Sequence, residues 1–169
     1  MVGSLNWCVT LGRWDVQHAA STYARYAQAP RKGHMTAMER IFGYLKHHAK
    51  RRTVYDVSMP DFSNYKLPSY DWFRRYPNAS EELDENMPEP KGMPVRIAGY
   101  FDASHASCLQ TRRSVTGVHL FLNNTPIESV SKRQGTVESS TYGSEIVAGR
   151  IAVDHVVGLL HDLRWLGVP

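Results

Sequence analysis

The order of apolar segments in residues 95–169 constrains the fold of this chain more than any other feature. VRIAGYF, beginning at Val95, alternates apolar and polar side chains with the two-residue period of a half-buried strand, and Asp102 follows it. SVTGVHLFL and TPIESVSK read as two further strands joined by a turn at Asn123 and Asn124. Ser and Thr residues then open a long helix that closes near Gly167. The sequence therefore predicts a β-β-β-α unit.

Two helices are expected in the first third of the chain. DVQHAASTYARYAQAP reads as a helix with Asp15 at its N-cap, and HMTAMERIFGYLKHHAK as a second one. Four apolar side chains of the second helix recur at i, i+3, i+4 and i+7: Met38, Ile41, Phe42 and Leu45. This spacing places them on one face and predicts core packing. The next residues, KRRTVYDV, close the helix with cations and favour a short strand.

The segment between these two parts, residues 58–92, has a different amino-acid composition. Residues 58–92 hold five of the nine prolines and the acidic run EELDE, which is typical of a long loop or insertion. Six aromatic side chains are expected to pin its first half to the body of the protein: Phe62, Tyr65, Tyr70, Trp72, Phe73 and Tyr76. We therefore divide the chain into a helical segment (1–57), an acidic, proline-rich loop or insertion (58–92) and a β-β-β-α domain (93–169).

Composition excludes several classes of protein. A content of 42% hydrophobic residues is enough for a core, and no apolar run is long enough to cross a bilayer. The first residues lack the pattern of a secretory signal, and Cys8 and Cys108 belong to no metal-binding or disulfide framework. We expect an intracellular protein, cytoplasmic or nuclear, with no membrane partner.

The charges are unevenly distributed along the chain. Residues 31–56 carry seven Lys or Arg against two acids, whereas residues 58–92 carry four against seven. The first block is a candidate surface for phosphates, and the second would repel a polyanion. The densest basic cluster is Lys50, Arg51 and Arg52, which equally well fits a cation cluster at a helix C-terminus.

Asp102 and Glu145 are the candidate catalytic residues. A β-β-β-α order can place an acid of the first strand near an acid in the first turns of the helix, where the two carboxylates repel each other unless a divalent cation neutralises them. Mg²⁺ accepts carboxylate and phosphate oxygens together, and a pair of such ions promotes phosphodiester cleavage. Alternatively, Asp102 is a structural turn residue and Glu145 a solvated acid. The metal hypothesis requires the two side chains to approach closely enough to share a cation.

Eight short motifs, in order, resemble those of the Pol polyprotein of copia-type LTR retrotransposons, where reverse transcriptase ends and ribonuclease H begins. They are GSLNWC from Gly3, RWD at Arg13, PRKGH at Pro30, ERIFGYLK at Glu39, YFDASHA at Tyr100, TRRSVTG at Thr111, SKRQ at Ser131 and SSTYGSE at Ser139. The resemblance covers nearly the whole chain except residues 58–92. No single motif is specific, but their shared order is.

This resemblance implies a fold and an activity. Residues 1–57 would correspond to the thumb or connection helices of reverse transcriptase, and residues 93–169 to the first half of an α+β, ribonuclease H-like fold, truncated before its fourth strand. The parent family cleaves the RNA strand of RNA–DNA hybrids with Mg²⁺ or Mn²⁺. Asp102 matches its first metal-binding Asp, and Glu145 its helix Glu.

The chain also departs from the family pattern. The third metal-binding carboxylate belongs to a D-N-x-x-A segment beyond the helix, and the sequence stops at Pro169 before it. Ser104, Trp14 and Gly143 replace family residues within the motifs, which suggests a diverged copy. We therefore expect weak cleavage or none from this chain alone; the alternative is a non-catalytic remnant that binds nucleic acid or protein.

Two further expectations concern partners. Arg112, Arg113, Lys132 and Arg133 are candidates for contact with the phosphates of an RNA–DNA hybrid, although short basic pairs are equally often solvated turn charges. In the parent fold the first strand pairs with the missing fourth strand. Residues 95–101 should therefore expose an unpaired edge, open to the rest of the polyprotein or to a second copy.

Overall fold

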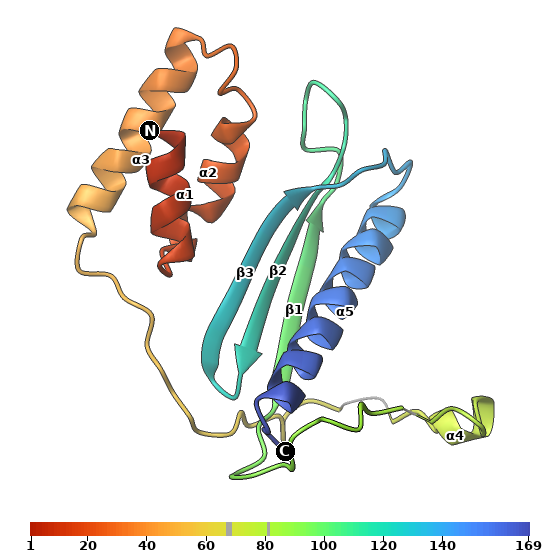
Figure 1. Ribbon diagram of the computed structural model, residues 1–169. Helices are drawn as coiled ribbons and strands as arrows, with labels where there is room; N and C mark the ends of the chain where they lie inside the picture. Colours follow the sequence, from red (N-terminus) through yellow and green to blue (C-terminus); the bar gives the residue numbers. More distant parts are fainter. Residues whose placement is uncertain (67–68, 81) are drawn as a thin grey trace.

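The protein, described by a computed structural model for residues 1–66, 69–80 and 82–169, has mixed α and β structure with one antiparallel sheet (Figure 1). Its elements in chain order are α1 (Val2–Thr10), the 3-10 turn η1 (Trp14–Val16), α2 (Gln17–Ala24), α3 (Lys32–His47), α4 (Trp72–Arg75), β1 (Ile97–Ser104), β2 (Val115–Leu122), β3 (Thr125–Arg133) and α5 (Thr141–Trp165). The predicted β-β-β-α order and the α+β class are confirmed.

The sheet is a three-stranded meander with the order β1-β2-β3. Ile97 pairs with Leu122 and Ser104 with Val115, so β1 and β2 are aligned over their full length. The tight turn at Asn123, whose φ is +55°, joins β2 to β3, as the paired asparagines predicted. A register shift at Leu120 and Phe121 interrupts the second ladder. Within the described chain, the outer edge of β1 has no neighbouring strand.

Helix α5 covers one face of this sheet and packs on β1 and β2. Val118, Leu120 and Ala152 are the buried centre of the interface. Small residues allow the close approach, because a Cβ on Gly149 would lie 3.2 Å from the Phe101 ring. The Ser140 hydroxyl caps the helix by accepting a hydrogen bond from the Gly143 amide, which confirms the expected Ser cap.

The first three helices form a separate cluster with its own core. Leu5, Val16, Ala20, Met38 and Ile41 are buried together, with Phe42 and Leu45 packed against them. The predicted apolar face of α3 is therefore confirmed. Helix α1 was not anticipated from the sequence.

This helical unit contacts the sheet on the face opposite α5. The Gln17 side chain donates to the carbonyl of Ser129 and accepts from its hydroxyl, and His18 and Ser21 lie 3.3 Å from the Ser131 hydroxyl. All these links are polar, so α2 is joined to β3 by hydrogen bonds rather than by a shared apolar core.

Asp15 does not cap α2, contrary to the prediction. Its carboxylate instead forms a bidentate pair with the Arg13 guanidinium at 2.9 and 3.0 Å, and the N-cap of α2 is Val16. The hydrogen bond from Arg13 is the main reason that the pKa of Asp15 lies below its usual value. The chain makes a 3-10 turn over Trp14–Val16 before the helix begins, and the helix ends at Ala24 rather than near Pro30.

The connection from α3 to β1 is mostly irregular. No strand forms at residues 51–57; the chain is instead tied to the β2–β3 turn, where the Asp56 amide donates to Thr125 and Asn123 donates to the Val57 carbonyl. At the other end of the connection, the Lys91 amide donates to the Gly167 carbonyl at 2.8 Å. Both ends of the segment are thus fixed, although Leu67, Pro68 and Glu81 lie outside the described residues.

The aromatic side chains of this segment do not pin it to the body as predicted, except for Phe62. The Phe62 ring is half-buried and lies 5.7 Å from the Arg96 guanidinium. Tyr70 and Trp72 stack on each other and stay exposed. The remaining three are also exposed: Tyr65, Phe73 and Tyr76. Among the described residues, no helix combines the length and apolar character needed to cross a bilayer.

Leu120 offers a test of the sheet–helix core. It is fully buried between β1, β2 and α5, so Leu120→Ala removes packed methyl groups and leaves a cavity. We expect a loss of about 2–5 kcal/mol in the free energy of unfolding, measured by urea denaturation. Leu109→Ala is the matched control, because Leu109 is 85% exposed and its truncation should change the stability little. Equal effects of the two substitutions would contradict this account of the core.

Candidate functional site

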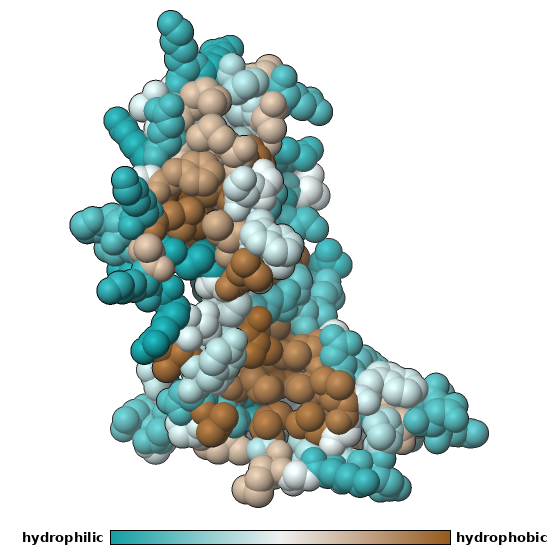
Figure 2. Space-filling model, turned by 60° about the vertical axis from the view of Figure 1, so that its left-hand side comes forward, coloured by the Kyte–Doolittle hydropathy of each residue, from teal (hydrophilic) through white to brown (hydrophobic). Residues whose placement is uncertain are grey.

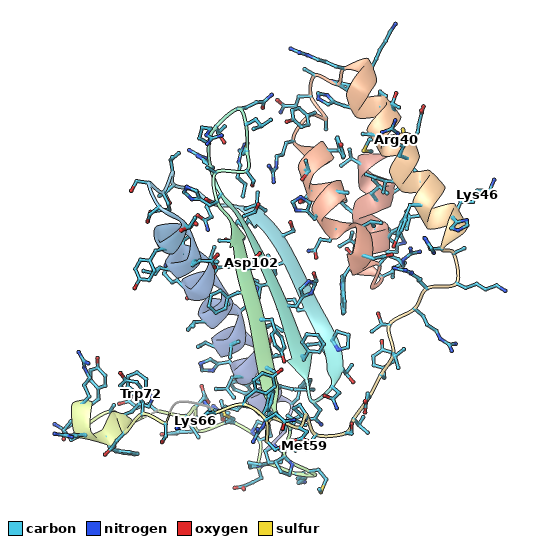
Figure 3. The ribbon with its side chains drawn as sticks, turned by 180° about the vertical axis from the view of Figure 1, so that it is seen from behind. Arg40, Lys46, Met59, Lys66, Trp72 and Asp102 are labelled. Atoms are coloured by element: carbon cyan, nitrogen blue, oxygen red, sulfur yellow. The ribbon has the colours of Figure 1, made fainter. Side chains whose placement is uncertain are left out.

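Asp102 lies within β1, two residues before its end, rather than at the strand tip as expected. Side chains alternate along the strand: Phe101 touches α5 at Gly149, so its neighbour Asp102 points to the opposite face. There it lines a hollow of about 180 Å³ between α2 and the sheet, with His18, Ser129 and Ser131. Figure 3 shows Asp102 on β1 with α5 behind the sheet.

Glu145 reaches the same strand from the α5 side. It lies just after the capped N-terminus of the helix, and its Oε1 accepts a hydrogen bond from the Ala103 amide at 3.3 Å. The Ala103 amide points away from β2, toward the open edge of the sheet, because no described strand pairs there. The Glu145 carboxylate therefore lies at the edge of β1, one residue from Asp102.

The two acids approach β1 from its two faces. Asp102 lines the hollow on the α2 face, whereas Glu145 comes from the α5 side and contacts the backbone at Ala103, the residue after Asp102. A cation shared by both carboxylates would have to lie beside the edge of β1, in line with the sheet. In the described residues, no group of three or more His, Cys, Asp or Glu side chains is arranged to hold a metal ion. The structure thus offers two candidate carboxylate ligands.

A buried polar network fixes the start of α5 against the sheet. The Gln134 side-chain amide donates to the Thr116 hydroxyl at 3.0 Å and to the Ser144 carbonyl at 2.9 Å. The Ser144 hydroxyl donates to Thr141 and lies 3.4 Å from His105 Nδ1. Since Ser144 directly precedes Glu145, these contacts hold the helix acid in position. This role of Gln134 was not predicted, because the burial of a polar residue at the end of a strand can be recognised only once the fold is known.

Four of the predicted phosphate-binding residues gather at the same end of the sheet as the acids. Arg112 and Arg113 belong to the loop between β1 and β2, and Lys132 and Arg133 end β3. Arg112 and Lys132 are exposed. Antiparallel pairing brings the end of β1, the start of β2 and the end of β3 together, so these cations share one end with Asp102.

The other predicted basic cluster lies at the opposite end of the sheet. Arg51 and Arg52 line a hollow of about 450 Å³ together with Arg13 and the turn residue Asn124, and Lys50 is exposed beside them. Arg51 donates to the Tyr44 hydroxyl at 2.8 Å, with its guanidinium 5.8 Å from the ring. The structure therefore does not bring Lys50, Arg51 and Arg52 together with the candidate acids.

An apolar hollow lies at this second end as well. It measures about 610 Å³ and is lined by side chains of the connection and of the β2–β3 hairpin, including Val57, Met59, Met93 and Ile127. Figure 2 shows a broad apolar area below the helical unit. This surface had no counterpart in the sequence analysis, because its residues come from three separate segments.

Cys108 is a buried thiol with a lowered pKa, which the sequence analysis did not single out. It lies in the loop between β1 and β2, and hydrogen bonds from the Thr111 hydroxyl and amide lower the pKa of its thiol to about 6, with a smaller contribution from Arg133. Arg133 Nη1 lies 3.8 Å from the sulfur. A fold-dependent loop contact of this kind leaves no signature in sequence spacing.

Comparison of the chain with family models, with curated proteins and with solved structures found no match.

The Cys108 environment predicts its reactivity. Because the thiolate is the nucleophile, the rate of alkylation at Cys108, followed by peptide mass spectrometry, should rise with pH to half its maximum near pH 6. Thr111→Val removes the main donor and should move this midpoint to higher pH. Thr136→Val, at an exposed threonine elsewhere, is the control and should leave it unchanged. An identical midpoint in the Thr111 variant would reject the assignment.

Proposed function

We propose that this chain is part of a divalent-metal-dependent, ribonuclease H-like nuclease of a copia-type retrotransposon polyprotein. The observation that carries the proposal is the hydrogen bond from the Ala103 amide to Glu145, which holds a helix carboxylate at the edge of β1 beside Asp102. The antiparallel β1-β2-β3 sheet, followed by α5 across one face, supports the same assignment. The eight ordered motifs of the sequence support it independently.

Asp102 and Glu145 are the residues that would hold Mg²⁺ or Mn²⁺. Their donor set fits, because hard oxygen ligands suit these ions and two nearby carboxylates favour a cation between them. A divalent ion held by these carboxylates would supply the chemistry of water activation, for cleavage of the RNA strand to a 3′-hydroxyl and a 5′-phosphate. The chain's own task is to orient the two carboxylates: β1 sets Asp102, and the Gln134 network together with the Ala103 amide sets Glu145.

The cations at this end of the sheet would hold the hybrid over the acids. Arg112, Arg113, Lys132 and Arg133 can contact phosphates, which position a duplex without reading its sequence. The substrate in this proposal is an RNA–DNA hybrid, and the partner is the remainder of the polyprotein. This function implies an intracellular location, cytoplasmic or nuclear.

Cleavage by this chain alone should be weak. Two carboxylates leave a metal ion with few protein ligands, so its position and its bound water are poorly defined. Asp154 and Asp162 lie on α5 around a different hollow, next to Glu128 of β3, and cannot supply a further ligand beside Asp102 and Glu145.

A second function, nucleic-acid binding without catalysis, is favoured by the basic helical unit. Lys50, Arg51 and Arg52 follow the C-terminus of α3, whose Arg40 and Lys46 are also exposed. Figure 3 shows Arg40 and Lys46 on this helix, away from Asp102. A surface of this kind binds phosphates through charge alone, with a steep dependence on salt.

Asp102→Asn separates the two functions. It removes the ligand charge with little change in shape, so Mg²⁺-dependent cleavage of a labelled RNA–DNA hybrid should fall by at least about 100-fold, since removal of a single catalytic electrostatic group commonly has that effect. Glu145→Gln should have a similar effect. Both variants should retain most of the hybrid binding measured by fluorescence anisotropy.

Asp154→Asn is the matched control, because it makes the same change at an exposed acid of α5. It should cleave like the wild type. Cleavage that survives Asp102→Asn would refute the nuclease assignment. Binding without any cleavage in the wild type, weakened by Arg51→Ala with Arg52→Ala, would instead support the second function.

A further inference from the structure

We propose that a groove beside the β2–β3 turn binds an extended peptide segment of a partner protein, with apolar side chains followed by acidic ones. The groove, called here the hairpin groove, joins two hollows of about 530 and 610 Å³ that share Tyr55 and Ile127. It lies at the opposite end of the sheet from Asp102, so the inference does not depend on the proposed function.

One half of the hairpin groove is apolar and open. Its side chains come from the connection, from the residues just before β1 and from the β2–β3 hairpin, and Tyr55, Val57 and Met93 are 81%, 84% and 82% exposed. Figure 2 shows the broad apolar area that they belong to, below the helical unit. A small-molecule pocket encloses most of its ligand. Side chains this exposed instead form an open trough, which fits a partner that supplies several apolar side chains in a row.

The other half of the hairpin groove is basic. Arg13, Arg51 and Arg52 line it, and the charge of Arg13 is balanced by the carboxylate of Asp15. One further acid, Asp56, lines the adjoining hollow, so two arginines face a single carboxylate. The excess positive charge favours an anionic group on the ligand. Because Arg52 and Tyr55 are three residues apart, about 10 Å in an extended chain, the acidic and apolar parts of the ligand must be separated by a similar length.

The chain between the two halves offers unpaired backbone groups. In the part of the chain that the structure describes, no amide or carbonyl of residues 52–55 has a hydrogen-bond partner. Figure 1 shows this segment as an extended run from α3 toward the hairpin. It is held at both ends: Thr53 Oγ1 lies 3.1 Å from the place that a Cβ on Gly12 would take, and the Asp56 amide donates to Thr125. A segment fixed in this way can pair with an extended peptide at a low cost in ordering.

A peptide uses all three features of the hairpin groove together. A nucleic acid would engage Arg51 and Arg52 through its phosphates but leave the apolar half uncovered. An extended peptide instead directs alternate side chains into the trough and offers its own amides and carbonyls to residues 52–55. Antiparallel pairing is the more stable arrangement. It places the apolar residues of the peptide first in its sequence, beside Val57 and Met93, and the acidic residues last, beside the arginines.

The first test uses a fluorescein-labelled peptide, VTVTVDDE, whose valines recur at every second position and precede the acids. Its binding to the full chain is measured by fluorescence anisotropy, and we expect a dissociation constant on the order of 100 μM. The peptide EDDVTVTV has the same composition in reverse order and should bind at least about 10-fold more weakly. Bound VTVTVDDE should also slow hydrogen exchange at the amides of residues 53–55 by at least about 10-fold, because a peptide held by side chains alone would leave these amides open to solvent.

Two substitutions test the two halves of the groove separately. Arg52→Ala removes a partner of the acidic residues, and Met93→Glu places a charge in the apolar half. Each should raise the dissociation constant of VTVTVDDE at least about 10-fold. Arg75→Ala and Leu109→Glu are the matched controls: they make the same changes at an exposed arginine of α4 and at a side chain that is 85% exposed, and should bind like the wild type.

Four results would overturn the proposal. They are the absence of VTVTVDDE binding at millimolar concentration, equal binding of the reversed peptide, unchanged exchange at residues 53–55, and a Met93→Glu variant that binds like the wild type. Labelled oligouridylate is the remaining probe. If it binds with a dependence on Arg52 while the peptide does not bind, the arginines serve a nucleic acid and the peptide assignment is rejected.

Discussion

One constraint governs this structure: β1 is both the strand on which α5 packs and the open edge of the sheet. Its odd-numbered side chains face the helix, while its odd-numbered backbone groups face the open edge. A side chain that comes around the helix can therefore bind the edge directly, as Glu145 does at Ala103. The same geometry brings an acid to the strand and exposes apolar helix residues beside it.

Close packing of α5 on β1 depends on small residues at the contact. Gly99 and Gly149 admit Val156 and the Phe101 ring to within about 3.2–3.3 Å of the positions a Cβ would take. Ala103 keeps the strand near the helix at the level of Glu145. If these positions were larger, α5 would move outward, and the Glu145 carboxylate would lose the Ala103 amide. The core and the candidate site are therefore coupled through the same strand.

The sequence was sufficient for the β-β-β-α order and the face of α3, because both depend on periodicity within a single segment. It was insufficient wherever specific side-chain contacts decide the outcome. Asp15 looked like a helix cap, but Arg13 binds its carboxylate. The alternation of apolar and polar side chains along β1 could be read from the sequence, but the face of the sheet that α5 covers could not. The placement of Asp102 and Glu145 on opposite faces therefore followed only from the fold. The hydrogen bonds of Gln134 and the lowered pKa of Cys108 depend on contacts that the spacing of residues in the sequence does not predict.

The Glu145 contact also divides the open edge of β1 into two parts. By accepting the Ala103 amide, the carboxylate removes that residue from strand pairing and limits an incoming strand to residues 97–101. The end of β1 that carries Asp102 stays accessible, together with Arg112 and Lys132 at the same end of the sheet. The carboxylate therefore takes up the edge position of Ala103, next to the end of β1 that carries Asp102.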